Sequence, residues 1–238
     1  MGEAGIRGIV VITGTDTGVG KTIATAAIAA AATAGDMRVA VVKPCQTGVA
    51  AGDEPDVEVV ARLADPALTK TLATYGPALA PTVAARLTGA PLIRMHDVAR
   101  EVRAIATHHD LVLVEGAGGL LVPMGERNWT VADLAVELGA SVVVAVRASL
   151  GTLNHTALTL EALARRGIRG MVVIGSWPVD PEVVHRTNLR ELPEISGVIP
   201  EAVGSLGGAT FRSAAHEWLA PRLHGSLDVA EFVAREGG

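Results

Sequence analysis

Six short, uninterrupted apolar runs constrain the fold of this chain more than any other feature. They are rich in Val and Ile and lie at residues 9–12, 39–42, 111–114, 142–146, 172–174 and 197–199. Strands that are covered on both faces of a parallel sheet read as continuous apolar runs, because neither face meets water. Longer Ala- and Leu-rich segments separate the runs, and this alternation predicts an α/β fold with a doubly wound, mostly parallel sheet of about six or seven strands.

Several helix ends can be read between these runs. The segment from Thr130 to Asp133 has the pattern of a capping box, and Gly139 marks the expected end of that helix. A second helix is expected from Thr152 to Arg166, and Pro181 is expected in the first turn of a third. These signals place helices on the crossovers between strands.

Two regions are less regular. Residues 65–94 are rich in Pro and Ala and are expected to pack as short helices. After Gly204, a helix is expected over residues 209–219, as a cap on the sheet. Because no repeat, low-complexity stretch or linker interrupts the chain, we expect one domain, residues 1–238.

Composition excludes several classes of protein. The chain has 20 Lys and Arg against 25 Asp and Glu and only 3% aromatic residues, so it lacks the basic surface and stacking platforms of a nucleic-acid binder. Its single cysteine, Cys45, excludes an internal disulfide and a zinc site of several cysteines. The most apolar helical stretch, residues 23–34, is shorter than the ~20 residues that span a bilayer. With no secretory signal in view, we expect a cytoplasmic protein without a membrane partner.

A glycine-rich loop follows the first apolar run. The segment Gly14–Thr22 reads Gly-Thr-Asp-Thr-Gly-Val-Gly-Lys-Thr and leads into an Ala-rich helix, the context of a phosphate-binding loop in a P-loop nucleotide-binding fold. Lys21 would neutralise the β- and γ-phosphates, and the Thr22 hydroxyl would bind Mg²⁺. The usual first glycine of the motif is Thr15 here. Asp16 stands where P-loop ATPases of the partition type have a second lysine, which favours an enzyme over a nucleotide-driven switch.

Two further strand ends carry charged side chains, and ligands gather at the carboxyl ends of strands in such sheets. Lys43 follows the second run, where it is either solvated or a second cation over a reacting anion. Glu115 follows the third run and precedes Gly116, a pattern that indicates a Mg²⁺ ligand beside a closely approached substrate. Asp56, at the start of a helix expected over residues 56–63, is either an N-cap or a second carboxylate for the metal.

Taken together, four segments resemble the dethiobiotin synthetase family of biotin biosynthesis. They are Gly14–Thr22, Lys43-Pro44-x-x-Thr47-Gly48, Glu115-Gly-Ala-Gly-Gly and Gly151-Thr-Leu-Asn-His155. The resemblance implies a homodimeric cyclo-ligase that depends on Mg²⁺ and a nucleoside triphosphate. Its substrates would be 7,8-diaminononanoate (7,8-diaminopelargonate) and CO₂, or bicarbonate as its source, with the substrate site at the subunit interface.

The resemblance also implies roles for individual residues. Catalytic roles fall to Lys21, Lys43, Asp16 and Thr17, with Asp16 beside the amine end of the substrate. Magnesium would be bound by Thr22, Asp56 and Glu115. Thr47 would contact the amine or carbamate, and the turn at Gly151, Thr152, Leu153 and Asn154 would take the substrate carboxylate from the partner subunit, with plain N-capping by Thr152 as the alternative. The nucleotide would contact Thr15, Gly18, Val19, Gly20, Lys21, Thr22, Asp56, Glu115, Gly116, Ala117, Gly118, Gly175, Ser176, Pro200, Glu201 and Ala202.

One departure from the family concerns the nucleotide base. The family often has an asparagine that reads the adenine edge shortly after the strand expected at 172–174, whereas this chain reads Gly-Ser-Trp-Pro-Val-Asp from Gly175. A missing side-chain contact relaxes discrimination by ~1–3 kcal/mol, so we expect weak base selectivity. A partition-type regulatory ATPase is the alternative function. An amide-forming synthetase of cobalamin assembly is disfavoured, because such enzymes usually carry an added glutamine-hydrolysing domain with a nucleophilic cysteine.

Overall fold

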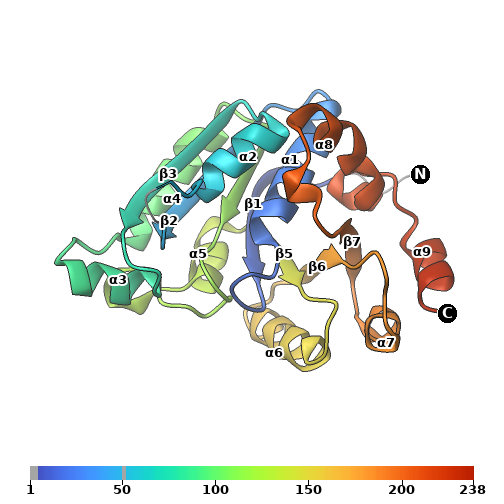
Figure 1. Ribbon diagram of the computed structural model, residues 1–238. Coiled ribbons are helices and arrows are strands. Elements are labelled where there is room, and N and C mark those ends of the chain that lie inside the picture. Colours follow the sequence, from blue (N-terminus) through green and yellow to red (C-terminus); the bar gives the residue numbers. More distant parts are fainter. Residues whose placement is uncertain (1–4, 50–51) are drawn as a thin grey trace.

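Seven parallel strands form one sheet in the computed structural model, which describes residues 5–49 and 52–238. The strand order is β3-β2-β4-β1-β5-β6-β7, and every pairing between neighbouring strands is parallel. The strands are β1 Gly8–Gly14, β2 Val39–Thr47, β3 Leu68–Tyr75, β4 Leu111–Glu115, β5 Ser141–Val146, β6 Gly170–Trp177 and β7 Ile195–Pro200. This order confirms the doubly wound sheet, with β1 in the middle and its loop at the carboxyl edge (Figure 1).

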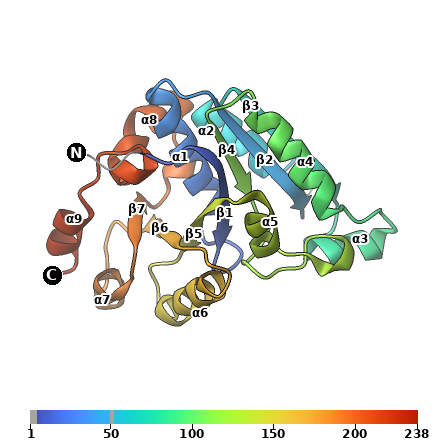
Figure 2. The same cartoon turned by 180° about the vertical axis from the view of Figure 1, so that it is seen from behind.

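Helices cover both faces of the sheet (Figures 1 and 2). The α-helices are α1 Lys21–Ala34, α2 Asp56–Ala64, α3 Pro81–Thr88, α4 Met95–Ala106, α5 Val131–Leu138, α6 Thr152–Ala164, α7 Val183–Glu191, α8 Gly208–Ala214 and α9 Val229–Glu236. Short 3₁₀ segments are η1 Glu126–Asn128, η2 Val203–Ser205, η3 Ala215–Trp218 and η4 Pro221–Leu223. In the described part of the chain, no helix has the length and apolarity to cross a membrane.

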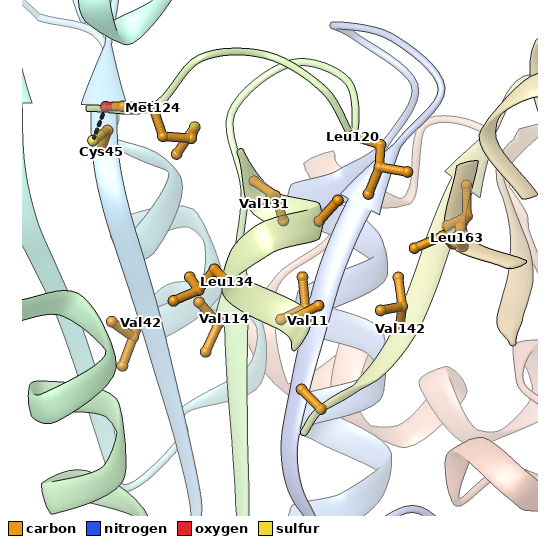
Figure 3. Packing of buried hydrophobic residues seen from close by; sticks show 14 of the residues in the cluster. Val11, Val42, Cys45, Val114, Leu120, Met124, Val131, Leu134, Val142 and Leu163 are labelled. Carbon is orange, nitrogen blue, oxygen red and sulfur yellow. Dashed lines mark hydrogen bonds between the residues drawn. The ribbon is translucent and has the colours of Figure 1, made fainter. Parts of the chain in front are cut away.

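Two apolar cores, one on each face, account for the uninterrupted runs. On β1, Val11 packs with Leu134 of α5, whereas Val10 and Ile12 pack with Ile28 of α1 on the opposite face. Figure 3 shows the first of these cores, where side chains from β1, β2, β4 and β5 meet α5. Successive residues of each central strand therefore enter different cores, and all of them must be apolar.

Most expected elements are present, including the capping box of Thr130 and Asp133 that begins α5. The short helices expected over 65–94 are confirmed in part by α3, but residues 68–75 form β3, which pairs with β2. β3 is an edge strand with the sequence LTKTLATY and is mostly half-buried, so it has no continuous apolar run. Pro181 precedes α7 rather than opening it, since Glu182 is the N-cap of that helix.

The C-terminal segment from α8 to η4 packs on the face of the sheet that α1 covers. The helix expected over 209–219 is shorter, because α8 ends at Ala214 and continues as η3. Phe211 and Trp218 lie in the same core as α1, with their rings edge to face at 5.1 Å between centroids. The tail thus closes one core, and α9, which was not expected, follows it.

Candidate active site

The phosphate loop lies between β1 and α1. Gly20 is the N-cap of α1 and has φ of 89°, and a Cβ at this position would lie 2.6 Å from the carbonyl oxygen of Gly175 on β6. Glycine is therefore required here both by the backbone conformation and by the close approach of β6. Lys21 is buried, and its Nζ donates to the carbonyl oxygen of Asp16 at 2.8 Å. Burial lowers the pKa of Lys21, and the carboxylate of Glu115 partly opposes that shift.

A group of charges lies next to the loop, with Lys43 and Glu115 buried and Asp56 half-buried. Lys43 Nζ is 2.8 Å from Glu115 Oε1 and also contacts the Asp56 carboxylate, and the Thr22 hydroxyl donates to Glu115 Oε1 at 3.0 Å. We call Thr22, Lys43, Asp56 and Glu115 the acid–lysine cluster. Lys43 and Glu115 are 2% and 1% exposed. Burial alone would lower the pKa of Lys43, but the carboxylates of Glu115 and Asp56 outweigh it and the pKa is raised.

The fold explains why these four side chains meet. β2 and β4 are neighbours in the sheet, so their carboxyl ends bring Lys43 and Glu115 together. Asp56 is the first residue of α2, whose N-cap is Pro55, so the N-cap alternative for Asp56 is wrong. Its backbone N–H donates to Gln46 Oε1 at 3.2 Å, which ties the start of α2 to the end of β2.

The donor set of the acid–lysine cluster fits Mg²⁺. Mg²⁺ prefers oxygen ligands and is commonly bound by one or two carboxylates with a substrate phosphate. Asp56 and Glu115 contact the same lysine nitrogen, and the Thr22 hydroxyl touches Glu115, so three oxygen ligands converge. The residues that the structure describes contain no group of three or more His, Cys, Asp or Glu that could hold a metal.

A cleft of about 880 Å³ opens over the loop and the cluster. Of the expected site residues, its walls include Thr17, Gly18, Gly20, Lys21, Thr22, Lys43, Thr47, Asp56, Glu115, Ala117 and Gly118. The loop before α3 adds Ala78, Leu79 and Ala80 to the walls. The walls combine lysines and carboxylates with apolar side chains, which suits a ligand with a charged group and an aliphatic chain.

A second, smaller cleft of about 230 Å³ lies on the other side of the loop. Its walls are Gly18, Val19, Arg147, Ala148, Ser149, Ser176, Pro178, His185 and Glu201. Four of these were expected at the nucleotide: Gly18, Val19, Ser176 and Glu201. The Glu201 carboxylate accepts a hydrogen bond from the backbone N–H of Val179 at 2.8 Å. No asparagine is among these wall residues, in keeping with the departure noted in the sequence.

Other expected residues lie outside both clefts. The Asp16 carboxylate accepts from Arg147 Nη2 at 3.2 Å and from the Thr17 N–H at 2.7 Å. Thr15 N–H donates to the Ala145 carbonyl on β5. Gly116 offers its carbonyl oxygen to Lys43 Nζ at 3.4 Å, and Gly175 packs against Gly20. Pro200 and Ala202 are exposed beside Glu201.

The turn at Gly151–Asn154 begins α6 and is not among the residues that line either cleft of this chain. Gly151 is the N-cap of α6, so capping by Thr152 was wrong; the Thr152 hydroxyl is buried and has no hydrogen-bond partner among the described residues.

Sequence reasoning missed Arg147, which directly follows β5 and reaches both the loop and the second cleft. Its place at a strand end was the signal that could have found it.

Comparisons with known proteins agree with this geometry. A family model described as an AAA domain matches residues 9–207. The ATP-dependent dethiobiotin synthetase of Streptomyces coelicolor is 48% identical over 96% of this chain and 99% of its own length. The enzyme of the same name from Saccharopolyspora erythraea is 51% identical over 91% of this chain and 97% of its own.

A solved structure of cobyrinic acid a,c-diamide synthase from Mycobacterium smegmatis, with a bound ATP analogue and magnesium, shares the fold. It has a TM-score of 0.56 and 17% identity, and covers 88% of this chain and 93% of that one. The sequence relatives match across nearly their whole length. This chain therefore belongs to the dethiobiotin synthetase family.

Proposed function

We propose that this chain closes the cyclic urea of dethiobiotin from 7,8-diaminononanoate and CO₂ at the expense of a nucleoside triphosphate. The observation that carries the proposal is the 48% identity to a dethiobiotin synthetase over 99% of that enzyme's length. The cleft adds independent support, because it joins a phosphate loop to a second buried lysine and an apolar wall. ATP is the co-substrate in the relatives' names.

The reaction needs three bond-forming steps. One amine of the diamine adds to CO₂ and loses a proton, which gives a carbamate. A carbamate oxygen attacks the γ-phosphorus, and the bond to the β-phosphate oxygen breaks to release the nucleoside diphosphate. The second amine attacks the carbon of the carbamic–phosphoric anhydride, loses a proton and expels inorganic phosphate as the ring closes. Phosphorylation is required because a free carbamate is a poor electrophile.

Lys21 and Lys43 would bring two anions together. The carbamate and the triphosphate repel each other, and fixed cations in a water-poor site offset that repulsion most strongly where charge develops. Lys21 Nζ donates to the Asp16 carbonyl oxygen, and Lys43 Nζ is paired with the carboxylates of Glu115 and Asp56. Each lysine would turn from its present partners toward the reacting phosphoryl group. Thr17 would lie beside that group, since it lines the same cleft.

Thr22, Asp56 and Glu115 would hold Mg²⁺, because their oxygens converge as the ion requires. When bound, the ion would neutralise charge on the β- and γ-phosphate oxygens. The contribution of the chain is to hold these three oxygens beside the phosphate loop. Glu115 is fixed by its burial and by the Thr22 hydroxyl.

The second cleft would hold the nucleoside. It adjoins Gly18 and Val19 of the phosphate loop, so a nucleotide whose phosphates lie in the loop can extend into it. Ser176 and Glu201 would contact the ribose or base, with Pro200 and Ala202 closing over it. Because no asparagine reads the base, we propose weak base selectivity. A preference for ATP of more than about a hundredfold over the other three common nucleotides would contradict this part of the proposal.

We propose that the diamine lies in the large cleft with its amines near Thr47 and Lys43. Its carboxylate would bind the α6 turn, Gly151–Asn154, of a second copy of the chain, where free N–H groups of a helix start suit an anion. Exposed apolar side chains on and beside this turn support a subunit contact, with Leu150, Leu153 and Leu158 being 87%, 38% and 57% exposed. The double substitution Leu150→Asp and Leu158→Asp is expected to give monomers in light scattering and weaker diamine binding.

The proposal also covers organisation and location. All seven strands of the described residues join one sheet, which supports a single domain. The cytoplasmic location expected from the sequence stays part of the proposal, and cell fractionation tests it. A partition-type ATPase is not favoured, because the relatives of similar length are dethiobiotin synthetases.

Product analysis tests the function. The purified protein is incubated with Mg²⁺, bicarbonate and each of the four common nucleoside triphosphates, with and without the diamine. We expect dethiobiotin by mass spectrometry and an equal amount of phosphate, only when the diamine is present. Phosphate release at the same rate with and without the diamine, and no cyclic urea, would contradict the proposal.

A further inference from the structure

We propose that Arg147 is a positioning residue that holds the tip of the phosphate loop, Asp16 and Thr17, when the triphosphate binds. Its Nη2 donates to the carbonyl oxygen of Thr17 at 2.9 Å and to the Asp16 carboxylate at 3.2 Å. The same carboxylate accepts from the Thr17 backbone N–H at 2.7 Å. Arg147 therefore fixes both residues at the tip, one through its backbone and one through its side chain.

The tip has few other attachments. Lys21 Nζ donates to the Asp16 carbonyl oxygen at 2.8 Å, and that bond holds the tip from inside. The lysine of a phosphate loop must turn to the β- and γ-phosphates once a nucleotide is bound. The Asp16 carbonyl then loses this donor, and among the residues that the structure describes Arg147 is the side chain outside the loop that still bonds to the tip.

The position of Arg147 in the fold suits this task. It follows Val146, the last residue of β5, and β5 pairs directly with β1, which leads into the loop. The Thr15 N–H donates to the Ala145 carbonyl oxygen on the same strand. β5 thus anchors the loop at its base through Ala145 and at its tip through Arg147. A fixed tip keeps the loop's N–H groups directed at the phosphates.

The expected effect is modest. The side chains of Arg147 and Asp16 are 49% and 55% exposed, so solvent screens their ion pair. Losing this pair together with the bond to the Thr17 carbonyl should weaken phosphate binding by about fivefold. Because the effect acts on the loop and not on the base, it should be the same for every ligand that carries the phosphates.

The test measures binding of ADP and of pyrophosphate by calorimetry at fixed Mg²⁺, with thermal unfolding alongside. Arg147→Met keeps the aliphatic stem but removes the guanidinium, and Arg165→Met, which breaks an exposed pair with Glu161 on α6, is the matched control. We expect Arg147→Met to weaken both ligands about fivefold and the control to weaken neither by more than about twofold. Asp16→Asn should weaken both less, because Arg147 keeps its bond to the Thr17 carbonyl oxygen. The double variant should be no worse than Arg147→Met, because that substitution already removes the Arg147–Asp16 pair.

Three results would overturn the proposal. Unchanged affinity in Arg147→Met would show that the tip needs no such anchor, and a lower melting temperature with unchanged affinity would assign Arg147 a purely structural role. Weaker ADP with unchanged pyrophosphate would show that Arg147 acts on the nucleoside through the second cleft. The inference rests on the nucleotide site of the proposed function but not on the diamine. The binding test therefore gives its result whether or not the unaltered protein makes dethiobiotin, so failure of the proposed function is distinguishable from failure of the proposed role of Arg147.

Discussion

Replacing Lys43 by methionine should destabilise the protein strongly unless Mg²⁺ is present. Coulomb's law at an effective dielectric constant of ~20 gives about 6 kcal/mol for unit charges 2.8 Å apart, the Lys43–Glu115 distance. Removing one partner of a buried pair typically costs ~3–5 kcal/mol, because the other charge stays buried alone. Glu115 keeps the Thr22 hydroxyl as a donor, so we expect a loss near the lower end, about 3 kcal/mol.

That loss corresponds to a fall in melting temperature of about 6–12 °C for a chain of this size. Thermal unfolding followed by circular dichroism, with and without Mg²⁺, measures it. In the unaltered protein Mg²⁺ must displace Lys43, whereas in Lys43→Met it meets two carboxylates without a cation. Added Mg²⁺ should therefore raise the melting temperature of Lys43→Met more than that of the unaltered protein.

Lys70→Met is the matched control, because Lys70 forms a 2.6 Å ion pair with Glu101 in which both side chains are 39% exposed or more. Removing an exposed pair costs ~0–1 kcal/mol, so Lys70→Met should stay close to the unaltered protein. Equal stability of Lys43→Met and Lys70→Met would refute the reasoning. So would an equal effect of Mg²⁺ on the Lys43→Met variant and the unaltered protein.

Three more predictions concern other parts of the molecule. Gly20→Ala should weaken ADP binding at least about tenfold in calorimetry, since a left-handed backbone costs a non-glycine residue ~1–3 kcal/mol and the new Cβ meets the Gly175 carbonyl. The Arg38 N–H is the main group that lowers the pKa of the Asp110 carboxyl. A carboxyl whose pKa is lowered in the folded state stabilises the fold above its unfolded pKa of ~3.9, and this stabilisation is lost as pH falls through the folded pKa. Asp110→Asn should therefore be less stable than the unaltered protein at pH 7 in urea titrations, and the difference should shrink as the pH is lowered below ~3.9. Phe211→Ala should cost about 3–5 kcal/mol in urea unfolding, because that side chain is fully buried, whereas a loss below about 1 kcal/mol would show that the tail packs loosely.

The central strands could be predicted from the sequence because burial on both faces requires an unbroken run of apolar residues. Each residue of β1 from Val10 to Ile12 must be apolar, so the strand shows as an unbroken run. β3 has no such apolar run, since an edge strand with half-exposed faces tolerates Thr and Lys at successive positions. Its pairing with β2 depends on tertiary contacts that a local pattern does not contain.

The candidate site likewise contains residues that the sequence could predict and a contact that it could not. Lys43 and Glu115 stand directly at the ends of apolar runs, and the topology of parallel sheets brings such ends together. The contact between Asp16 and Arg147 joins residues 131 positions apart and depends on how the loop tip folds. No local pattern contains that conformation, so the sequence does not predict the pairing of Asp16 with Arg147, and a place for Asp16 beside the substrate amine stays a prediction.

Isotope transfer tests the central claim most directly. The protein is mixed with the diamine, Mg²⁺, ATP and ¹⁸O-labelled bicarbonate. The reaction is stopped before the bicarbonate loses its label to water, and the phosphate is analysed by mass spectrometry. Since a carbamate oxygen attacks the γ-phosphorus, the account predicts one labelled oxygen in the phosphate, formed together with dethiobiotin. Phosphate that carries no label and is released equally without the diamine would contradict it.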